Sequence, residues 1–192
     1  MKSQVTTKHG DSGETRTLGG DAVSKADPTI ECTGAVDAVR AQIALLRLEI
    51  LERKADDAES IAEFLFWVLH VLFLVGTQCN DPHKKKPEYW HEPVAPKHLD
   101  RLEAFQAKLE AEVQLPKKFT VSAGTYLGAR ADVVVTEVRA LERSMTRLRE
   151  SVTEFDTEHL LPLVNRLSDA LFLLSRKLDG ESFVPLKYEI LE

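Results

Sequence analysis

The sequence predicts an all-α protein that folds as an antiparallel five-helix bundle. Five stretches carry apolar residues at three- and four-residue steps, which is the period of a helix with one buried face. Most connections between these stretches are short, and short connections favour antiparallel neighbours. No stretch of useful length has the two-residue alternation of a strand. A chain of 192 residues can bury a sizeable core in one domain, or at most two.

The first helix is expected over residues 28–54. Asp27 followed by Pro28 is typical of a helix start, because the acid accepts backbone N–H groups and proline fits the first helical position. The apolar residues of the predicted buried face follow at helical spacing: Ile30, Ala35, Val36, Val39, Ile43, Leu46 and Ile50.

The second helix is expected to begin with a capping box, Asp56-x-x-Glu59, and to run to about residue 79. Its stretch 61–76 is 16 residues long and almost wholly apolar, although it contains Glu63. A membrane-spanning helix needs about 20 apolar residues. We therefore interpret this stretch as a central core helix, covered by neighbouring helices or by another subunit, and expect no membrane partner.

Three further helices are expected over residues 96–113, 125–153 and 157–178, with connections at 80–95 and 114–124. The chain is then divided into a flexible N-terminal segment, 1–27, a helical bundle domain, 28–180, and a C-terminal tail, 181–192.

The histidines show no metal-ligand spacing on a regular element. His70 is interpreted as a hydrogen-bonded core or interface histidine, and His83, His91 and His98 as loop residues. No cluster of metal ligands is apparent, so no metal site is predicted. The sequence also lacks a Ser/His/Asp or Cys/His pattern for a protein nucleophile.

The net charge and the cysteines limit the ligands and the compartment that fit this chain. The net charge is −6, which makes the chain a poor binder of nucleic acids and anionic membranes, so an anionic ligand needs a local cluster of cations. Cys32 and Cys79 form neither a CxxC pair nor a disulfide framework, which fits a reducing compartment. The first 27 residues lack the apolar stretch of a secretory signal. We expect a cytoplasmic protein.

The polar segment from Thr7 to Pro28 is the strongest candidate for ligand binding. Four glycines fall within eleven residues, mixed with hydroxyl side chains and followed by Lys25. Successive N–H groups of such a loop can point at one anion, and a lysine adds a point charge. The spacing fits neither GxxxxGK[ST] nor GxGxxG. On composition alone, a disordered tail is the alternative.

Polar side chains on the predicted helices are the other candidates. Two groups share a face at i, i+3 and i+4, and a third is spaced at i, i+3: Asn165, Ser168 and Asp169; Arg139, Glu142 and Arg143; Asp37 and Arg40. Asparagine suits a base edge or a sugar, because its amide both donates and accepts. The alternative for each group is a solvated face with intrahelical ion pairs.

Together these pieces resemble the PduO-type ATP:cob(I)alamin adenosyltransferases over about residues 7–178. The matching motifs are Thr7…Gly10-Asp11-x-Gly13-x-Thr15, Leu18-Gly19-Gly20, Ser24-Lys25-x-Asp27-Pro28-x-Ile30-Glu31, Gly34-x-Val36-Asp37, Leu72-Phe73 with Gly76, Phe119, Glu142-Arg143, and Asn165-Arg166-Leu167-Ser168-Asp169 with Leu171-Phe172. The Asn165–Asp169 pentapeptide and the Ser-Lys-x-Asp-Pro element are the most specific.

The resemblance implies a trimer of five-helix subunits, with ATP and a corrinoid bound between neighbouring subunits. Cobalt(I) of cobalamin attacks the 5′ carbon of ATP, which gives adenosylcobalamin and triphosphate without a protein nucleophile. It implies ATP and Mg²⁺ as ligands of an N-terminal ATP-binding segment, and a homotrimer as the assembly. Whether the product passes directly to an adenosylcobalamin-dependent partner enzyme stays open.

The resemblance also assigns site residues. The ATP phosphates and Mg²⁺ would be held by the N-terminal set Thr7, Gly10, Asp11, Gly13, Thr15 and Lys25. Further contacts to ATP would come from the helical set Arg139, Glu142, Arg143, Asn165 and Asp169. Phe119 matches the aromatic residue that crowds out the lower axial ligand of cobalt, which makes cobalt(II) easier to reduce. Phe119, Arg139 and Asp37 are the predicted catalytic residues.

The sequence departs from the family pattern near the fourth helix. The family's Leu-Pro-Gly-Gly turn is Val121-Ser122-Ala123-Gly124 here, and its double arginine is Arg139-Ala140. The positions of a family histidine and arginine hold Asp132 and Val135. That arginine pairs with the aspartate matching Asp37 across the subunit interface, so Asp37 needs another partner, for which Arg40 and Arg130 are candidates.

Three hypotheses follow. The first is an active adenosyltransferase with a rearranged interface, which the retained Phe119 favours. The second is an ATP- or corrinoid-binding protein of the same fold, a carrier or sensor, which Val135 and Ala140 favour. The third is a helical-bundle interaction protein, which needs neither the N-terminal loop nor the Asn165–Asp169 element.

Overall fold

The structure is a computed structural model that describes residues 8, 10–115, 119–180, 182 and 184–191. In order, the helices are α1 (Pro28–Glu52), α2 (Ala58–Asn80), α3 (Pro96–Glu112), α4 (Tyr126–Ser151) and α5 (Leu160–Asp179). The short strands are β1 (Glu14–Arg16), β2 (Ala22–Ser24), β3 (Thr120–Ser122) and β4 (Val184–Pro185), and the 3₁₀ turns are η1 (Pro87–Tyr89) and η2 (Tyr188–Ile190). The predicted five-helix bundle is confirmed.

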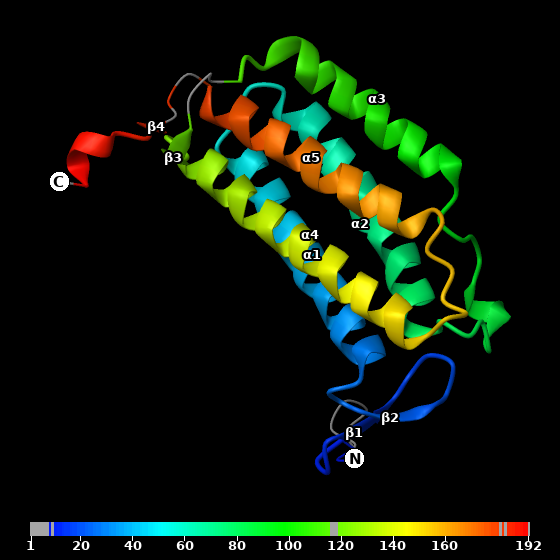
Figure 1. Ribbon diagram of the computed structural model, residues 1–192. Helices are drawn as coiled ribbons and strands as arrows, with labels where there is room; N and C mark the ends of the chain where they lie inside the picture. The colour runs from blue at the N-terminus through cyan, green and yellow to red at the C-terminus, as the bar shows by residue number, and fades with distance from the viewer. Residues whose placement is uncertain (1–7, 9, 116–118, 181, 183, 192) are drawn as a thin grey trace, which may run out of the picture.

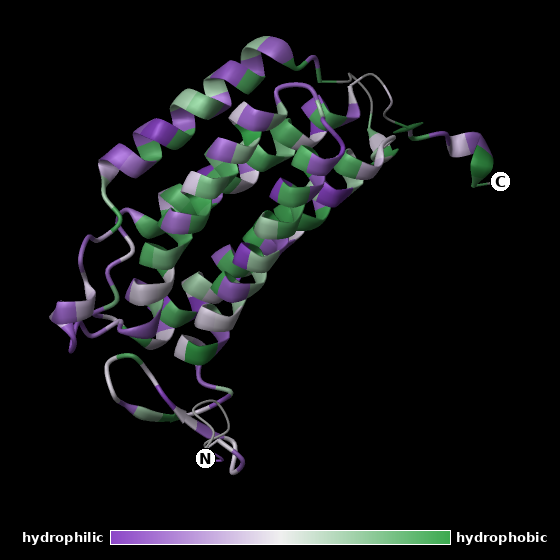
Figure 2. Ribbon diagram, turned by 180° about the vertical axis from the view of Figure 1, so that it is seen from behind, coloured by the Kyte–Doolittle hydropathy of each residue, from purple (hydrophilic) through white to green (hydrophobic). Residues whose placement is uncertain are grey.

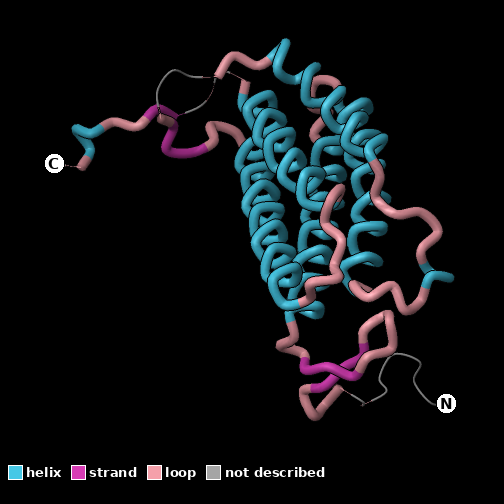
Figure 3. Tube along the Cα trace, turned by 45° about the vertical axis from the view of Figure 1, so that its right-hand side comes forward, coloured by secondary structure: helices cyan, strands magenta, loops and turns pink. Residues whose placement is uncertain are grey.

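The bundle places its two small sheets at opposite ends. Helix α4 packs against α1 and α5, α1 packs against α2, and α3 lies outside against α5. The hairpin of β1 and β2 lies beyond the start of α1, whereas β3 and β4 lie where α4 begins (Figure 1). The tube view shows the same separation (Figure 3). The 26 residues of α4 span about 39 Å between these ends.

The core is aliphatic and continuous between the helices. Its largest fully buried side chains include Ile43, Leu65, Leu102, Leu141 and Leu171, one from each helix. Figure 2 shows hydrophobic residues concentrated in the inner helices and a mostly hydrophilic α3 on the outside. Each fully buried leucine or isoleucine contributes about 1.5–3 kcal/mol through removal from water, so this stripe pattern stabilises the bundle.

Helix α2 is long and apolar enough to cross a membrane by length and composition, but 44% of its most apolar window is buried inside the bundle. The core helix of a bundle can be equally long and apolar, and a core helix is what the sequence predicts for this stretch. Its outer side is nevertheless uncovered in a single chain, with Phe66 49% and Phe73 61% exposed. His70 is exposed on this side and is therefore not a core histidine, although its Nδ1 lies 2.8 Å from the carbonyl oxygen of Phe66.

Two helix starts test the capping predictions. The start of α1 is confirmed: the N–H of Thr29 donates to Asp27 Oδ1 at 2.8 Å. The capping box of α2 is wrong, because the N-cap is Asp57, whose backbone is left-handed (φ +57°) and whose side chain caps nothing. The Asp57 carboxylate instead binds Lys177 of α5 at 2.8 Å, a partner that the local pattern does not contain.

Two further expectations need correction. No stretch of the sequence predicted a strand of useful length, yet β1 pairs with β2 and β3 with β4, both antiparallel. Strands of three residues or fewer are too short to show a period. His98, expected in a loop, lies in α3 and is buried, because its Nδ1 accepts the N–H of Ala95 at 3.0 Å and closes the first turn.

Candidate ligand site

The N-terminal hairpin is fixed against the end of α2. Pairing runs from Glu14 opposite Ser24 to Arg16 opposite Ala22. The N–H of Leu18 is 3.1 Å from the carbonyl oxygen and 3.0 Å from Oδ1 of Asn80. These contacts hold the glycine-rich segment at the end of the bundle where α1 begins (Figure 1).

Lys25 lies directly over the glycine loop. Its N–H donates to the carbonyl oxygen of Gly13 at 2.8 Å, and Gly13 has a left-handed backbone (φ +84°) that favours glycine. A Cβ at Gly10 would lie 3.0 Å from Lys25 Nζ, so a larger residue there would crowd the ammonium group. Asp11 is exposed beside it, and Thr15 is half-buried in β1. Thr7 lies outside the described residues.

A second brace holds the loop that follows α2 and ties it to the hairpin. Asp81 is 1% exposed and accepts the N–H groups of Lys85 and Lys86, each at 2.9 Å, and Trp90 Nε1 at 3.1 Å. Lys85 Nζ in turn donates to Asp21 Oδ1 of the hairpin at 2.6 Å. Sequence reasoning missed Asp81. The available signal was an acid before proline and three lysines, Asp81-Pro82-x-Lys84-Lys85-Lys86, where a carboxylate commonly turns the chain.

Two buried thiols lie beneath this end of the bundle. Cys32 of α1 and Cys79 of α2 are both inaccessible and hydrogen-bonded to each other. That bond lowers the pKa of Cys32, and together with burial it raises the pKa of Cys79 well above its ordinary value. The pair joins α1 to α2 next to Asn80, on which the hairpin rests.

Asp37 is exposed on α1 and pairs with Arg40 at 3.2 Å, as one of the two candidate partners predicted. Arg40 also lies over the ring of Phe73, 5.3 Å from its centroid. Arg130 is not a partner of Asp37, because it binds Glu49 at 3.1 Å and Gln42 at 2.6 Å, farther along α1.

The helical candidates share one level of the bundle. The pair Asp132–Arg176 links α4 and α5, which are antiparallel (Figure 1). Arg139 stands seven residues after Asp132, and Asp169 seven residues before Arg176, so the two are level; four residues further, Arg143 is level with Asn165. By the same count from the Glu31–Arg147 pair, Asp37 is level with this turn of α4.

Arg139 and Arg143 are two cations at this level of the bundle. Within the described chain no carboxylate pairs with Arg139 or Arg143, and both are exposed. Asn165 is also exposed, and Asp169 pairs with Arg166 at 3.1 Å. Two expectations are modified here. Glu142 forms no intrahelical ion pair among described residues, and Ser168, expected on the face of Asn165, is buried and donates to the carbonyl oxygen of Asn165.

The two divergent positions of α4 carry no free cation. Asp132 accepts both bonds of Arg176 Nη2, at 2.6 and 2.5 Å, and Arg176 is 6% exposed. Val135 is 8% exposed and belongs to the core. A structural ion pair and a core valine therefore stand where two cationic groups were expected from the resemblance.

Phe119 lies at the far end of the bundle from the glycine loop. It is 81% exposed and precedes β3, which pairs with β4 near the start of α4. The structure therefore brings Asp37, Arg139, Arg143, Asn165 and Asp169 to one level, places the hairpin beyond the start of α1, and leaves Phe119 apart from both (Figures 1 and 3).

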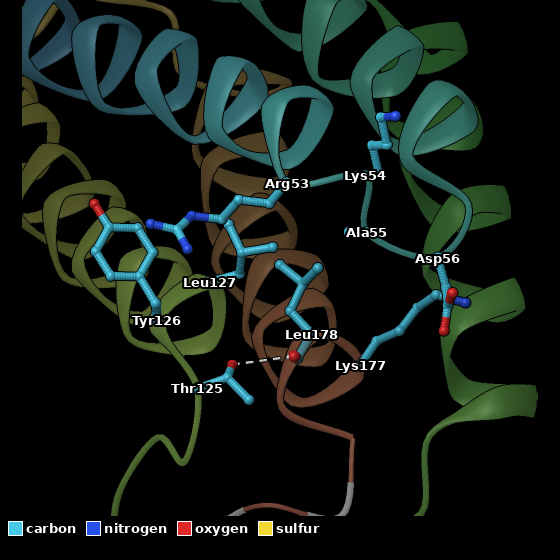
Figure 4. Close-up of a pocket in the computed structure, with 9 residues that line it drawn as sticks. All are labelled: Arg53, Lys54, Ala55, Asp56, Thr125, Tyr126, Leu127, Lys177 and Leu178. Carbon is cyan, nitrogen blue, oxygen red and sulfur yellow. Dashed lines mark hydrogen bonds between the residues drawn. The ribbon is translucent and has the colours of Figure 1, made fainter.

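A cavity of about 500 Å³ lies near this far end, between the turn after α1, the start of α4 and the end of α5. The guanidinium carbon of Arg53 lies 4.0 Å from the centroid of the Tyr126 ring, and the hydroxyl oxygen of Thr125 lies 3.1 Å from the carbonyl oxygen of Leu178 (Figure 4). Lys177 is bound by Asp57 and Glu112, which raise its pKa. None of the predicted site residues lines this cavity.

Almost the whole chain is similar in sequence to known proteins. A family model described as cobalamin adenosyltransferase matches residues 5–178. Corrinoid adenosyltransferase PduO of Salmonella typhimurium is 28% identical over 93% of this chain, which spans only 50% of that protein's length. The corrinoid adenosyltransferase of Mycobacterium tuberculosis is 28% identical over 91% of this chain and 88% of its own, and the cobalamin adenosyltransferase of Cupriavidus metallidurans is 29% identical over 92% and 89%.

Solved structures share the fold. A variant of the PduO-type ATP:corrinoid adenosyltransferase from Lactobacillus reuteri, complexed with cobalamin and ATP, superposes with a TM-score of 0.83 over 96% of this chain and 99% of that one, at 23% identity. A second variant of the same protein gives 0.82 at 24% identity.

Proposed function

Because the chain belongs to the cobalamin adenosyltransferase family, we propose that it transfers the 5′-deoxyadenosyl group of ATP to the cobalt(I) of cobalamin. The cobalt–carbon bond forms as the bond between the 5′ carbon and oxygen breaks, and triphosphate leaves with the electron pair. The products are adenosylcobalamin and triphosphate. One observation carries the assignment: the ammonium group of Lys25 lies over a glycine loop whose crowded position, Gly10, has no side chain.

Two groups of residues supply the ATP-binding half. Lys25 and the N–H groups around Gly10 and Gly13 offer positive charge and donors to the phosphates. Arg139 and Arg143 add two cations that no described carboxylate neutralises. Each charge-assisted contact to a phosphate is worth about 1.5–3 kcal/mol, so these local cations supply the cluster that an anionic ligand needs on a chain of net negative charge.

Mg²⁺ would come with the nucleotide. Among the described residues no three His, Cys, Asp or Glu side chains gather as a metal cage. Mg²⁺ usually binds through substrate phosphates and one or two protein oxygens, and Asp11 and Thr15 fit that pattern because both lie in the glycine segment. Bound there, it would neutralise phosphate charge.

The corrinoid half would be presented by Phe119. A large ring that is 81% exposed contributes little to this chain's core, so it is free to contact a ligand. The resemblance gives this position the task of displacing the lower axial ligand of cobalt.

The opposite positions of Lys25 and Phe119 favour a shared site in a homotrimer. One chain cannot bring both to one reacting centre across a bundle about 39 Å long, so different subunits would supply the two halves. The exposed apolar side chains of α1 and α2, which include Leu48, Phe66 and Phe73, offer surface for such an interface. The free buried thiols fit a cytoplasmic location. An adenosylcobalamin-dependent enzyme would consume the product.

A second candidate is an ATP- or corrinoid-binding carrier or sensor of the same fold. It is favoured by Asp132, which is committed to Arg176, and by Val135, which is in the core. Neither position supplies a cation for the transition state, whereas the loop around Lys25 serves binding without turnover.

Turnover and binding assays separate these functions. Loss of the cobalt(I) absorption is followed with reduced cobalamin and MgATP, and a rate equal to that without protein excludes the enzyme. Calorimetry with ATP then tests the carrier, and no heat of binding leaves only a helical-bundle interaction protein. Lys25→Ala should weaken ATP binding about 10-fold to 100-fold, as expected for one charge-assisted contact. Lys108→Ala, on exposed α3, is the matched control.

Mixed oligomers test the shared site. Lys25→Ala and Phe119→Ala chains, each impaired alone, are co-expressed and purified together. If one subunit supplies Lys25 and its neighbour supplies Phe119, about one quarter of the sites in a random mixture are intact and activity returns. If both residues of a site come from one chain, no intact site forms and the mixture stays inactive.

A further inference from the structure

Phe119 directly precedes β3, and the segment that the two form is held by its backbone, not by its side chains. Phe119 is 81% and Val121 62% exposed, so packing fixes neither. The carbonyl oxygen of Phe119 instead accepts the N–H of Leu186 at 2.8 Å. Next to this bond, β3 pairs with β4 through Thr120 opposite Pro185 and Ser122 opposite Val184. The aromatic ring therefore stands directly before a strand that pairs with the C-terminal residues.

The other end of this strand is anchored by Asp179. This carboxylate is 2% exposed, and its Oδ1 accepts the N–H groups of Gly124 and Thr125, each at 3.1 Å, and the Thr125 hydroxyl at 3.0 Å. Arg176 lies 3.4 Å from the second oxygen and is itself held by Asp132. The turn between β3 and α4 is thus tied to the end of α5.

Two glycines permit this close approach. A Cβ at Gly124 would lie 1.4 Å from the carbonyl oxygen of Ser182, which no side chain can tolerate. A Cβ at Gly128 would lie 2.0 Å from Asp179 Oδ1. At Ser182 the C-terminal chain therefore passes over the turn at backbone contact.

We propose that Asp179, Ser182 and Leu186, here called the C-terminal clamp, are positioning residues that fix how Phe119 is presented to the corrinoid. This inference rests on the proposed function and assigns a role to Asp179, at the end of α5, and to Ser182 and Leu186, which the sequence suggested belong to a tail. None of the three contacts the ligand in this role. They act by holding both ends of the segment formed by Phe119 and β3.

The clamp predicts a separation of effects. Displacing a positioned group by about 1 Å can cost 100-fold in rate. ATP binding should not change, because within the described chain the clamp residues contact none of the proposed ATP-binding groups Lys25, Arg139 and Arg143. A loosened clamp should therefore lower kcat and weaken the displacement of the axial cobalt ligand, while the affinity for ATP stays that of the unaltered chain.

Leu186→Pro tests the clamp, because proline removes the N–H that binds Phe119. Leu186→Ala, which keeps that N–H, is the matched control. We expect Leu186→Pro to lower kcat about 10-fold to 100-fold, to reduce the fraction of bound cobalt(II) that lacks an axial ligand in electron paramagnetic resonance, and to speed hydrogen exchange of residues 120–124. Leu186→Ala should match the unaltered protein in all three. A chain that ends at Gly180 is the second variant, should proline impair folding.

The outcomes decide the clamp and the enzyme separately. Unchanged exchange and unchanged axial ligation in Leu186→Pro and in the shortened chain overturn the clamp. Faster exchange with unchanged axial ligation also overturns it, because the segment would then be structural only. An unaltered protein without turnover refutes the proposed activity, and the clamp is then decided by exchange and by the spectrum of bound cobalt(II)alamin. If the protein leaves the cobalt(II) spectrum unaltered, it binds no corrinoid that Phe119 can contact. That result overturns both the clamp and the proposed activity.

Discussion

Two helical glycines should respond to alanine with opposite signs. Gly128→Ala in α4 places a methyl group 2.0 Å from Asp179 Oδ1, whereas Gly34→Ala in α1 meets nothing within 4 Å. Alanine is favoured over glycine inside a helix by about 1 kcal/mol, so Gly34→Ala should stabilise the single-chain fold by about that amount.

The cost at Gly128 follows from the bonds that Asp179 must give up. Its Oδ1 accepts three hydrogen bonds, and the added methyl forces it away from them. Loss of two bonds to a charged group costs about 3–6 kcal/mol, from which the helix preference of about 1 kcal/mol is subtracted. We expect a net loss of about 2–5 kcal/mol in the free energy of unfolding.

Urea unfolding followed by circular dichroism measures both variants. Protomer concentration is held constant, because association changes apparent stability. The reasoning is refuted if Gly128→Ala is as stable as the unaltered protein or more so. A loss of stability in Gly34→Ala would instead place a neighbouring chain against that exposed face of α1.

Three other measurements test separate parts of the structure. Asp81→Ala leaves three donors without their acceptor and should cost about 2–4 kcal/mol in urea unfolding, with a red-shifted tryptophan emission. The carboxylates around Lys177 raise its pKa above 10.5. The ammonium group therefore stabilises the folded protein fully below pH 10.5, and this stability is lost as the pH rises through the raised pKa. Lys177→Met should lack this alkaline loss when unfolding is measured against pH. Cys32 and Cys79 should resist a thiol reagent in the folded protein and both react in denaturant, because they are fully buried and the pKa of Cys79 is raised; rapid native labelling would contradict their burial.

The helices could be predicted because their cause is local and repeated. Val36, Val39, Ile43, Leu46 and Ile50 recur at the helical step, and all of them are buried. The start of α1 was equally accessible, because the cap involves Asp27 and the residue two positions later. The start of α2 was misplaced by one residue, since Asp56-x-x-Glu59 fits the capping pattern but the N-cap is Asp57, whose side chain forms no cap.

The missed features depend on contacts between distant residues. Strand β3 pairs with β4 some 60 residues later, and Asp132 binds Arg176 across 44 residues. Such pairs leave no period, and a three-residue strand has no room for one. The helical candidates could be nominated from the sequence, but the common level of Arg139, Arg143 and Asn165 on the bundle required the antiparallel register that the ion pairs set.

That register also explains why an acidic chain can offer a site for a polyanion. Glu49 and Asp132 neutralise Arg130 and Arg176 inside the bundle, so these two arginines serve the fold. The exposed Arg139 is left without a described carboxylate partner, because the matching side of α1 carries Asp37 paired to its own helix through Arg40. Arg139 is therefore screened only by solvent. Its attraction to an anion strengthens most when the bound ligand excludes water. Nucleotide affinity should therefore depend on closing the site between subunits more than on the net charge of the protein.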